Sequence, residues 1–158
     1  MRGKSAKKRI IEKDPIYQSR TIAKLINRSM KSGKKTIAES HIYGALDIIK
    51  EKSKKDPLEV LEIAIKNIAP QMEVRSRRVG GAAYQVPMPV RPNRANSLAV
   101  RWLVLAAQKK SNKEFHTYKE KLAAEIMDAY NNEGGAIQKK SSSHKMADAN
   151  KAFAHFRW

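Results

Sequence analysis

The segment MEVRSRRVGGAAYQVPMPV, residues 72–90, decides the fold because apolar residues alternate with other residues on both sides of a diglycine. A period of two is typical of a β-strand, and a Gly-Gly pair is favoured in a tight hairpin turn. We therefore predict a β-hairpin at about residues 72–90 that turns at Gly80 and Gly81. Pro87 and Pro89 lack amide donors, so the second strand is expected to be an edge strand. The apolar positions expected to face inward are Met72, Val74, Tyr84, Val86, Met88 and Val90.

Helical periodicity dominates on both sides of this hairpin. Ser19 can cap a helix that runs to about Lys31, and Asp56 with Pro57 and Glu59 starts a helix that stops before Pro70. The spacing of serine or threonine and glutamate predicts capping boxes at Thr36/Glu39 and Ser111/Glu114. The expected helices lie at about residues 20–31, 36–51, 57–69, 92–109, from 111 onward, and 136–149. The fold class is therefore mainly α, a bundle of about six helices with one inserted β-hairpin arm.

The helix expected at residues 92–109 is apolar around nearly its whole circumference, with Arg94 and Arg101 leaving one narrow polar strip. This pattern is typical of a central buried helix. Trp102 is accordingly interpreted as a core residue rather than a ligand contact.

The 158 residues are one domain's worth of chain. Residues 1–13 are basic without periodicity and are expected to form a flexible arm. Residues 14–158 are expected to form a single helical domain that carries the hairpin.

The formal net charge of +18 is unevenly distributed along the chain. Residues 1–35 carry +10 and residues 74–110 carry +8, whereas residues 36–73 carry −2 and the remainder +2. Six arginines and no lysine or acid lie between Arg75 and Arg101. Arginine offers a planar fork that matches phosphate, so the pattern favours a nucleic-acid partner. Residues 36–73, called the acidic block below, are expected to face away from the nucleic acid.

A second cationic feature lies on the first expected helix. At 100° per residue, its apolar residues share one side and four cations share the opposite side, with no acid among them. We interpret these cations as a phosphate-facing stripe, composed of Arg20, Lys24, Arg28 and Lys31.

Sites for enzymatic chemistry are not indicated. Cysteine is absent, which excludes disulfides and cysteine nucleophiles, and the four histidines lack ligand-like spacing. Gly33-Lys34-Lys35-Thr36 lacks the glycine and hydroxyl positions of a phosphate loop. The apolar runs are too short for a membrane span or a secretory signal. We therefore expect no enzyme, cofactor, metal or membrane association.

The aromatic residues Phe153, Phe156 and Trp158 cluster at the chain end. They predict either a tail folded onto the core or a docking point for a protein partner. Two other classes were weighed for the whole chain: a general nucleic-acid-compacting protein and a cationic membrane-surface protein. The acidic block argues against the first, and inward-facing apolar residues beside the stripe argue against the second.

Four stretches resemble the bacterial form of the family of small-subunit ribosomal protein number seven. They are LINRSMKSGKK, DPLEVLEIAIKNIAP, VRSRRVGGAAYQVPMPVRPNR and HKMADANKAFAHFRW, at residues 25–35, 56–70, 74–94 and 144–158. The resemblance implies a helical bundle with a hairpin arm that binds the 3′ major domain of 16S ribosomal RNA and nucleates assembly of the subunit head. It also implies a hairpin near the exit-site transfer RNA and the messenger exit path. The implied location is a cytoplasmic ribosome, or an organellar one if the gene is organelle-encoded.

The resemblance also implies roles for individual residues. The implied ribosomal RNA contacts are Arg2, Lys4, Lys7, Lys8, Arg9, Arg20, Lys24, Arg28, Lys31, Lys34, Lys35, Arg75, Arg77, Arg78, Arg91, Arg94 and Arg101. Residues implied to lie near transfer RNA are Gly80, Gly81, Ala82 and Tyr84. The implied contacts with partner proteins, including small-subunit protein eleven and the neighbours in the head, are Phe153, Phe156, Arg157 and Trp158.

Overall fold

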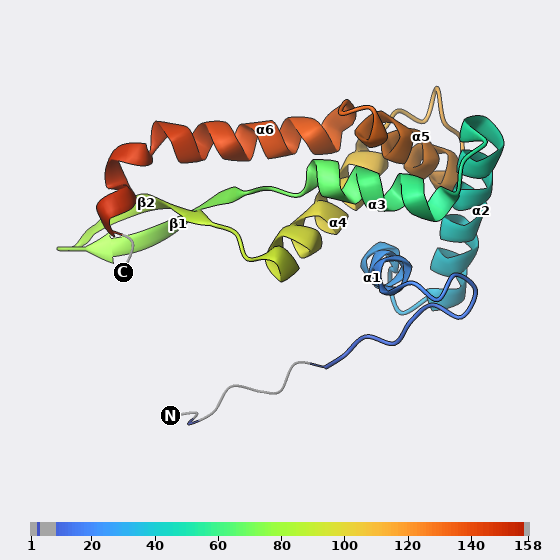
Figure 1. The fold of residues 1–158 in the computed structure, drawn as a ribbon, viewed down its shortest axis with the longest axis horizontal. Helices are drawn as coiled ribbons and strands as arrows, with labels where there is room; N and C mark the ends of the chain where they lie inside the picture. Colours follow the sequence, from blue (N-terminus) through green and yellow to red (C-terminus); the bar gives the residue numbers. More distant parts are fainter. Residues whose placement is uncertain (1–2, 4–8, 157–158) are drawn as a thin grey trace.

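The computed structural model describes residue 3 and residues 9–156. Six α-helices, one 3₁₀ helix and one antiparallel hairpin make up this part of the chain (Figure 1). In chain order they are α1 (Arg20–Ser29), α2 (Lys35–Ser53), α3 (Pro57–Ile68), β1 (Met72–Val79), β2 (Ala82–Pro89), α4 (Pro92–Lys109), α5 (Tyr118–Tyr130), α6 (Gly134–Ala149) and η1 (Lys151–Phe156). The predicted fold class, a helical bundle with an inserted hairpin arm, is confirmed.

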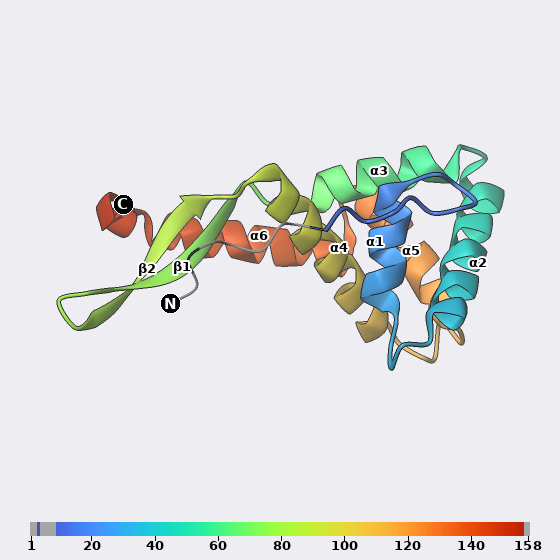
Figure 2. The same cartoon turned by 90° about the horizontal axis from the view of Figure 1, so that it is seen from below.

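The core lies where α5 packs against α2, α3 and α4, with α1 covering α2 and α4. The hairpin extends away from this bundle, and α6 runs alongside it, as both views show (Figures 1 and 2). No described helix is long and apolar enough to cross a bilayer. The large side chains that are fully buried are Ile22, Leu25, Ile26, Ile42, Leu46, Ile49, Leu61, Ile68, Leu103, Leu122, Ile126 and Glu125.

The prediction that the fourth helix is buried on nearly every side is wrong. α4 buries one face through Ala99, Leu103 and neighbouring residues, but Leu105 is 44% exposed. The more enclosed helix is α5, which packs against α2, α3, α4 and α6 and in which Lys119 is the only exposed residue. Trp102 is half-buried and packs against the core, as predicted.

Two of the predicted helix starts are confirmed. The Ser19 hydroxyl accepts a hydrogen bond from Thr21 N at 3.2 Å, and the Asp56 carboxylate accepts one from Leu58 N at 3.2 Å. These side chains satisfy backbone donors that the first helical turn leaves unpaired.

Both predicted capping boxes are wrong. α2 begins at Lys35 without a side-chain cap, and Glu39 instead forms an ion pair with Lys35 at 3.5 Å. α5 begins at Tyr118, where Thr117 and Glu120 form the capping box. Thr117 has the same three-residue spacing as the Ser111 pair but directly precedes the apolar run that packs into the core, so packing selects it.

The predicted hairpin is confirmed, with β1 and β2 paired from Met72 opposite Pro89 to Val79 opposite Ala82. Gly80 and Gly81 have φ angles of +58° and +87°, which side chains disfavour. The predicted alternation fails near the base of the hairpin. Glu73 is buried although it was expected to face outward, and the consecutive residues Val86 and Pro87 are both buried. Neighbouring elements therefore cover both faces of the ribbon there.

A buried charge cluster joins α4, α5 and α6. Lys110 Nζ lies 2.6 Å from Asp128 Oδ2 and 3.3 Å from Glu125 Oε2, and Glu125 is only 1% exposed. The other oxygen of Glu125 accepts a hydrogen bond from Ala136 N at 2.8 Å. Burial would lower the pKa of Lys110, but its hydrogen bond to Asp128 and the charge of Glu125 raise it overall. The cluster thus fixes the position of α6, which is the helix that lies along the hairpin.

Lys110→Met is expected to destabilise the protein by roughly 2–3 kcal/mol, because it leaves the Glu125 carboxylate buried without its cation. Urea denaturation monitored by circular dichroism measures this change in the free energy of unfolding. The matched control is Lys109→Met, since Lys109 is exposed and adjacent. Equal stability of the two variants would contradict a structural role for the cluster.

Candidate nucleic-acid interface

The cationic stripe of α1 follows from the amphipathic pattern of this helix. Ile22, Leu25 and Ile26 are buried against the bundle. On the other side Arg20 and Arg28 are exposed and Lys24 is half-buried, whereas Lys31, which was predicted on the same helix face, lies beyond the end of α1 and is exposed. Within the described part of the chain, none of these four cations has an ion-pair partner, so their charge is available to an external anion.

The stripe meets a second cation across the contact between α1 and α4. Lys24, Arg28 and Arg101 line one surface hollow of about 270 Å³, although Arg101 lies more than 70 residues along the chain from the other two. Sequence reasoning missed the polar residues Asn27 and Ser97, which also line it. Their spacing from Lys24 and Arg101, three and four residues, is the signal that could have placed them on the same helix faces. The packing of α1 on α4 therefore makes one cationic groove from two predicted cationic blocks.

A buried carboxylate organises the base of the hairpin. Glu73 Oε1 lies 2.6 Å from Arg75 Nη2, and Glu73 Oε2 lies 2.6 Å from Arg94 Nε. The Glu73 side chain is 10% exposed, whereas each arginine side chain is 51% exposed. Burial would raise the pKa of Glu73, but the hydrogen bonds from Arg94 and Arg75 outweigh it and lower the pKa overall. Glu73 therefore ties β1 to α4 and orients two arginines that keep exposed surface.

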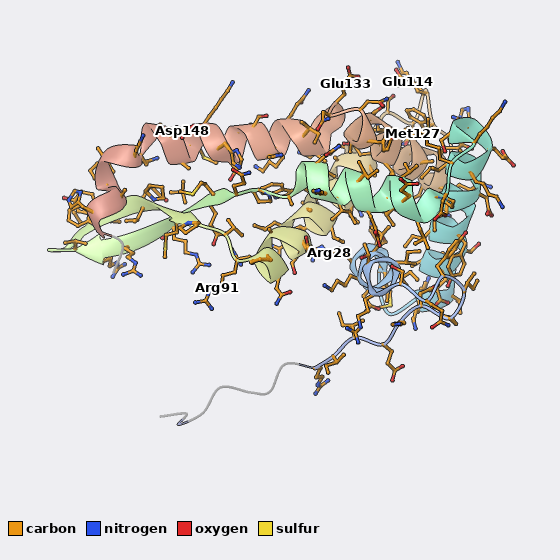
Figure 3. The ribbon with its side chains drawn as sticks, in the orientation of Figure 1. Arg28, Arg91, Glu114, Met127, Glu133 and Asp148 are labelled. Atoms are coloured by element: carbon orange, nitrogen blue, oxygen red, sulfur yellow. The ribbon has the colours of Figure 1, made fainter. Side chains whose placement is uncertain are left out.

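Four further arginines lie between Arg75 and Arg101, and unlike Arg75 and Arg94 they do not contact Glu73. Arg78, Arg91 and Arg101 are exposed and Arg77 is half-buried, and the described residues offer none of them an ion-pair partner. Arg77 lies opposite Tyr84 in the hairpin register. Arg91 and Arg28 lie on the same lower side of the molecule in Figure 3, whereas Glu114, Glu133 and Asp148 lie along the upper side. The two labelled arginines and the three labelled acids thus lie on opposite sides of the molecule.

The acidic block has the placement expected for a surface away from the cations only in part. α2 lies at the end of the molecule remote from the hairpin, whereas α3 runs between them (Figure 1). One acid of this block, Glu73, belongs to the arginine cluster itself.

The hairpin tip is open on all sides. Gly80, Gly81 and Ala82 are exposed, and a Cβ placed on either glycine would meet no atom within 4 Å. Lys34, in the turn from α1 into α2, and Lys35, the first residue of α2, are exposed as well. These residues can approach a partner closely.

The terminal aromatics pack on the hairpin rather than on the helical core. The Tyr84 ring centroid lies 5.2 Å from that of Phe153 and 5.1 Å from that of Phe156. η1 thereby rests on β2, and all three rings are half-buried. Up to Phe156 the tail is folded onto the hairpin and not onto the core, and a docking point for a protein partner at this end of the chain stays a prediction. Arg157 and Trp158 lie outside the described residues.

The arm joins the bundle at a buried aspartate. Asp14 is 2% exposed and accepts hydrogen bonds from Tyr17 N at 3.0 Å and from the Tyr43 hydroxyl at 2.6 Å. Burial first, and then the hydrogen bond to Asp14, raise the pKa of Tyr43. Arg9 is exposed on the arm side of this junction. The remaining predicted arm contacts, Arg2, Lys4, Lys7 and Lys8, lie outside the described residues.

Among the described residues no three histidine or acidic side chains gather as a metal site would require. His144 has a structural contact, since its Nε2 accepts a hydrogen bond from Gln71 N at 3.1 Å at the foot of the hairpin. The arrangement is that of a charged binding surface.

Comparisons with known proteins agree with this geometry. The family described as "Ribosomal protein S7p/S5e" matches residues 1–151. The chain is 60% identical to small ribosomal subunit protein uS7 of Caldicellulosiruptor bescii over 152 residues, 96% of each chain. It is 58% identical to the uS7 protein of Thermotoga neapolitana over 158 residues, all of both chains, and 56% identical to that of Heliobacterium modesticaldum over 157 residues, covering 99% and 98%. Members of this family are ribosomal proteins and not enzymes, as predicted, and the chain belongs to the ribosomal protein S7p/S5e family.

Proposed function

We propose that this chain is a structural constituent of the small ribosomal subunit that binds the 3′ major domain of 16S ribosomal RNA and nucleates assembly of the head. The observation that carries the proposal is the groove in which Lys24, Arg28 and Arg101 converge. Cations without internal partners neutralise phosphates and release condensed counterions, which supplies affinity. The bacterial relatives support a ribosome in the bacterial cytoplasm as the location.

Specificity would come from shape rather than from reading paired bases. The major groove of A-form RNA is too deep and narrow for side chains, so proteins recognise junctions and backbone geometry. The cations of the stripe and of the groove come from α1 and α4, and the arginines held by Glu73 come from β1 and α4. Such a set can touch several RNA helices at once, which supports binding at a junction.

The hairpin tip is proposed to lie near the exit-site transfer RNA and the messenger exit path. Gly80, Gly81 and Ala82 offer backbone without bulky side chains. Tyr84 contacts Phe153 and Phe156, so it supports the tip from within the chain. The proposed contacts with small-subunit protein eleven and the head neighbours would then use the surface of η1 that Tyr84 does not cover, and Arg157 and Trp158 stay predicted contacts.

The double variant Arg28→Ala/Arg101→Ala is expected to bind a 3′ major domain transcript at least tenfold more weakly at about 150 mM salt, with a salt slope reduced by about two. Filter binding across a salt series measures both quantities. The control Lys139→Ala/Lys145→Ala removes the same charge from exposed positions of α6. Equal losses in both variants, or equal affinity of the wild type for an unrelated transcript of the same length, would refute the groove as the specific contact.

Glu73→Gln separates arginine positioning from bulk charge. The substitution raises the net charge by one, so bulk electrostatics alone predicts tighter RNA binding. We expect weaker binding to the 3′ major domain transcript, because Arg75 and Arg94 lose the carboxylate that orients them. Glu62→Gln, at an exposed residue of α3, is the control with the same charge change. Tighter specific binding by Glu73→Gln would show that the orientation of these arginines is unimportant.

The same glutamate gives a pH dependence. The pKa of Glu73 is lowered in the folded protein, so its contribution to stability is present above the ordinary carboxyl pKa and is lost as pH falls through the lowered value. The free energy of unfolding of the wild type should therefore fall more steeply over this acidic range than that of Glu73→Gln. Parallel curves in urea titrations at stepwise lower pH would contradict the role of the two ion pairs.

Phe153→Ala/Phe156→Ala is expected to leave helical circular dichroism unchanged and to speed hydrogen exchange in β2, because the aromatic support of Tyr84 is removed. Met146→Ala, an exposed apolar residue of α6, serves as the control. Unchanged protection of β2 would mean that the hairpin holds its position without η1.

A further inference from the structure

A second hollow lies at the far end of α1, outside the groove described above. It occupies about 260 Å³ where the end of α1, the start of α2, the end of α4 and the start of α5 meet. These four element ends converge along the lower edge of Figure 2. Its lining is apolar at Ile37 and aromatic at Tyr118 and His41. It can therefore hold a flat, partly apolar group.

Cations stand around this hollow. Lys31 and Lys34 both line it and are exposed, and neither has an ion-pair partner among the residues the structure describes. Lys31 is also the last residue of the α1 stripe, so the hollow continues the proposed RNA-binding surface. An anion attached to the occupant would be stabilised at this rim.

The hollow also contains side chains that can form hydrogen bonds. Tyr118 and Ser29 share a hydrogen bond at 3.1 Å, and the rings of His41 and Tyr118 meet edge to face with centroids 5.9 Å apart. Gln108 reaches the same hollow from α4 and is exposed. An amide can both donate and accept, which suits the edge of a nucleobase.

Ile37 is 52% exposed at this site, although it is a large aliphatic residue that shares the hollow with Lys31 and Lys34. Covering its surface removes apolar area from water, which favours binding of an apolar face. An apolar side chain such as Ile37 would contribute nothing to a solvated contact with phosphate alone. The combination of an apolar floor, aromatic walls and a cationic rim fits one unstacked nucleotide.

On this basis, and resting on the proposed ribosomal RNA binding, we propose that the hollow binds a single unpaired nucleotide of the RNA. Its base would lie against Ile37 and the wall formed by His41 and Tyr118. Its edge would meet Gln108, and its phosphates would contact Lys31 and Lys34. Recognition of splayed, unpaired bases is how proteins read RNA that they cannot read in the helical groove.

The experiment uses the full chain, its Ile37→Asn variant and the 3′ major domain transcript. Dimethyl sulfate probes base edges of unpaired adenines and cytosines, carbodiimide probes uridines and guanines, and hydroxyl radicals probe the RNA backbone. The wild type should protect one or two unpaired bases that become reactive again with Ile37→Asn. Backbone protection elsewhere should remain, and affinity should fall about tenfold. With Gln108→Leu, the same bases should become reactive as with Ile37→Asn.

The matched control is Ile16→Asn, because Ile16 is 64% exposed and does not line this hollow. Wild-type affinity and protection of all bases with Ile37→Asn would overturn the proposal, as would an equal loss with Ile16→Asn. If Ile37→Asn left RNA protection intact but prevented a neighbouring protein from joining reconstituted subunits, the occupant would be protein and the proposal would be wrong. A wild type without preference for this transcript would instead refute the underlying RNA-binding function.

Discussion

The large excess of positive charge is the constraint on which the rest of this structure depends. With +18 on 158 residues, the cationic segments repel one another, and the fold must hold them in place against this repulsion. Three buried carboxylates stand at the places where those segments join the bundle. Asp14 anchors the arm, Glu73 ties the hairpin to α4, and Glu125 fixes the junction of α4, α5 and α6. Each accepts hydrogen bonds, and Glu73 and Glu125 also face cations, so their burial is compensated.

Local signals were sufficient for much of the fold. The hairpin follows from period-two alternation around a diglycine, and α3 follows from Asp56 and Pro57, because neighbouring residues decide these features. Where two local signals were equivalent, sequence reasoning failed. Ser111 and Thr117 both stand three residues before a glutamate, and only packing of the following apolar run distinguishes them. The prediction placed α4 at the centre because composition cannot show which of two apolar helices the fold encloses more fully.

The candidate interface shows the same division. That α1 carries cations on one face is a property of its own sequence, and the structure confirms that face as exposed. That Arg101 joins Lys24 and Arg28 depends on how α1 packs on α4, which no short-range pattern encodes. Glu73 illustrates the point most clearly. The alternation of the first strand set Glu73 apart from its apolar neighbours Met72 and Val74, but two arginines from different elements make its burial favourable.

Positioning also explains why the charge is carried by rigid elements. Unordered lysines would supply counterion release equally well, but their affinity would be the same for any RNA of similar charge density. Discrimination requires groups whose separation is fixed before binding, because only then does a wrong RNA shape leave contacts unmade. Arg75 and Arg94 meet this requirement because the buried carboxylate of Glu73 holds both. Tyr84 meets it because Phe153 and Phe156 of η1 pack against its ring. The buried acids and the terminal aromatics thus convert a general attraction for polyanions into a surface of defined shape.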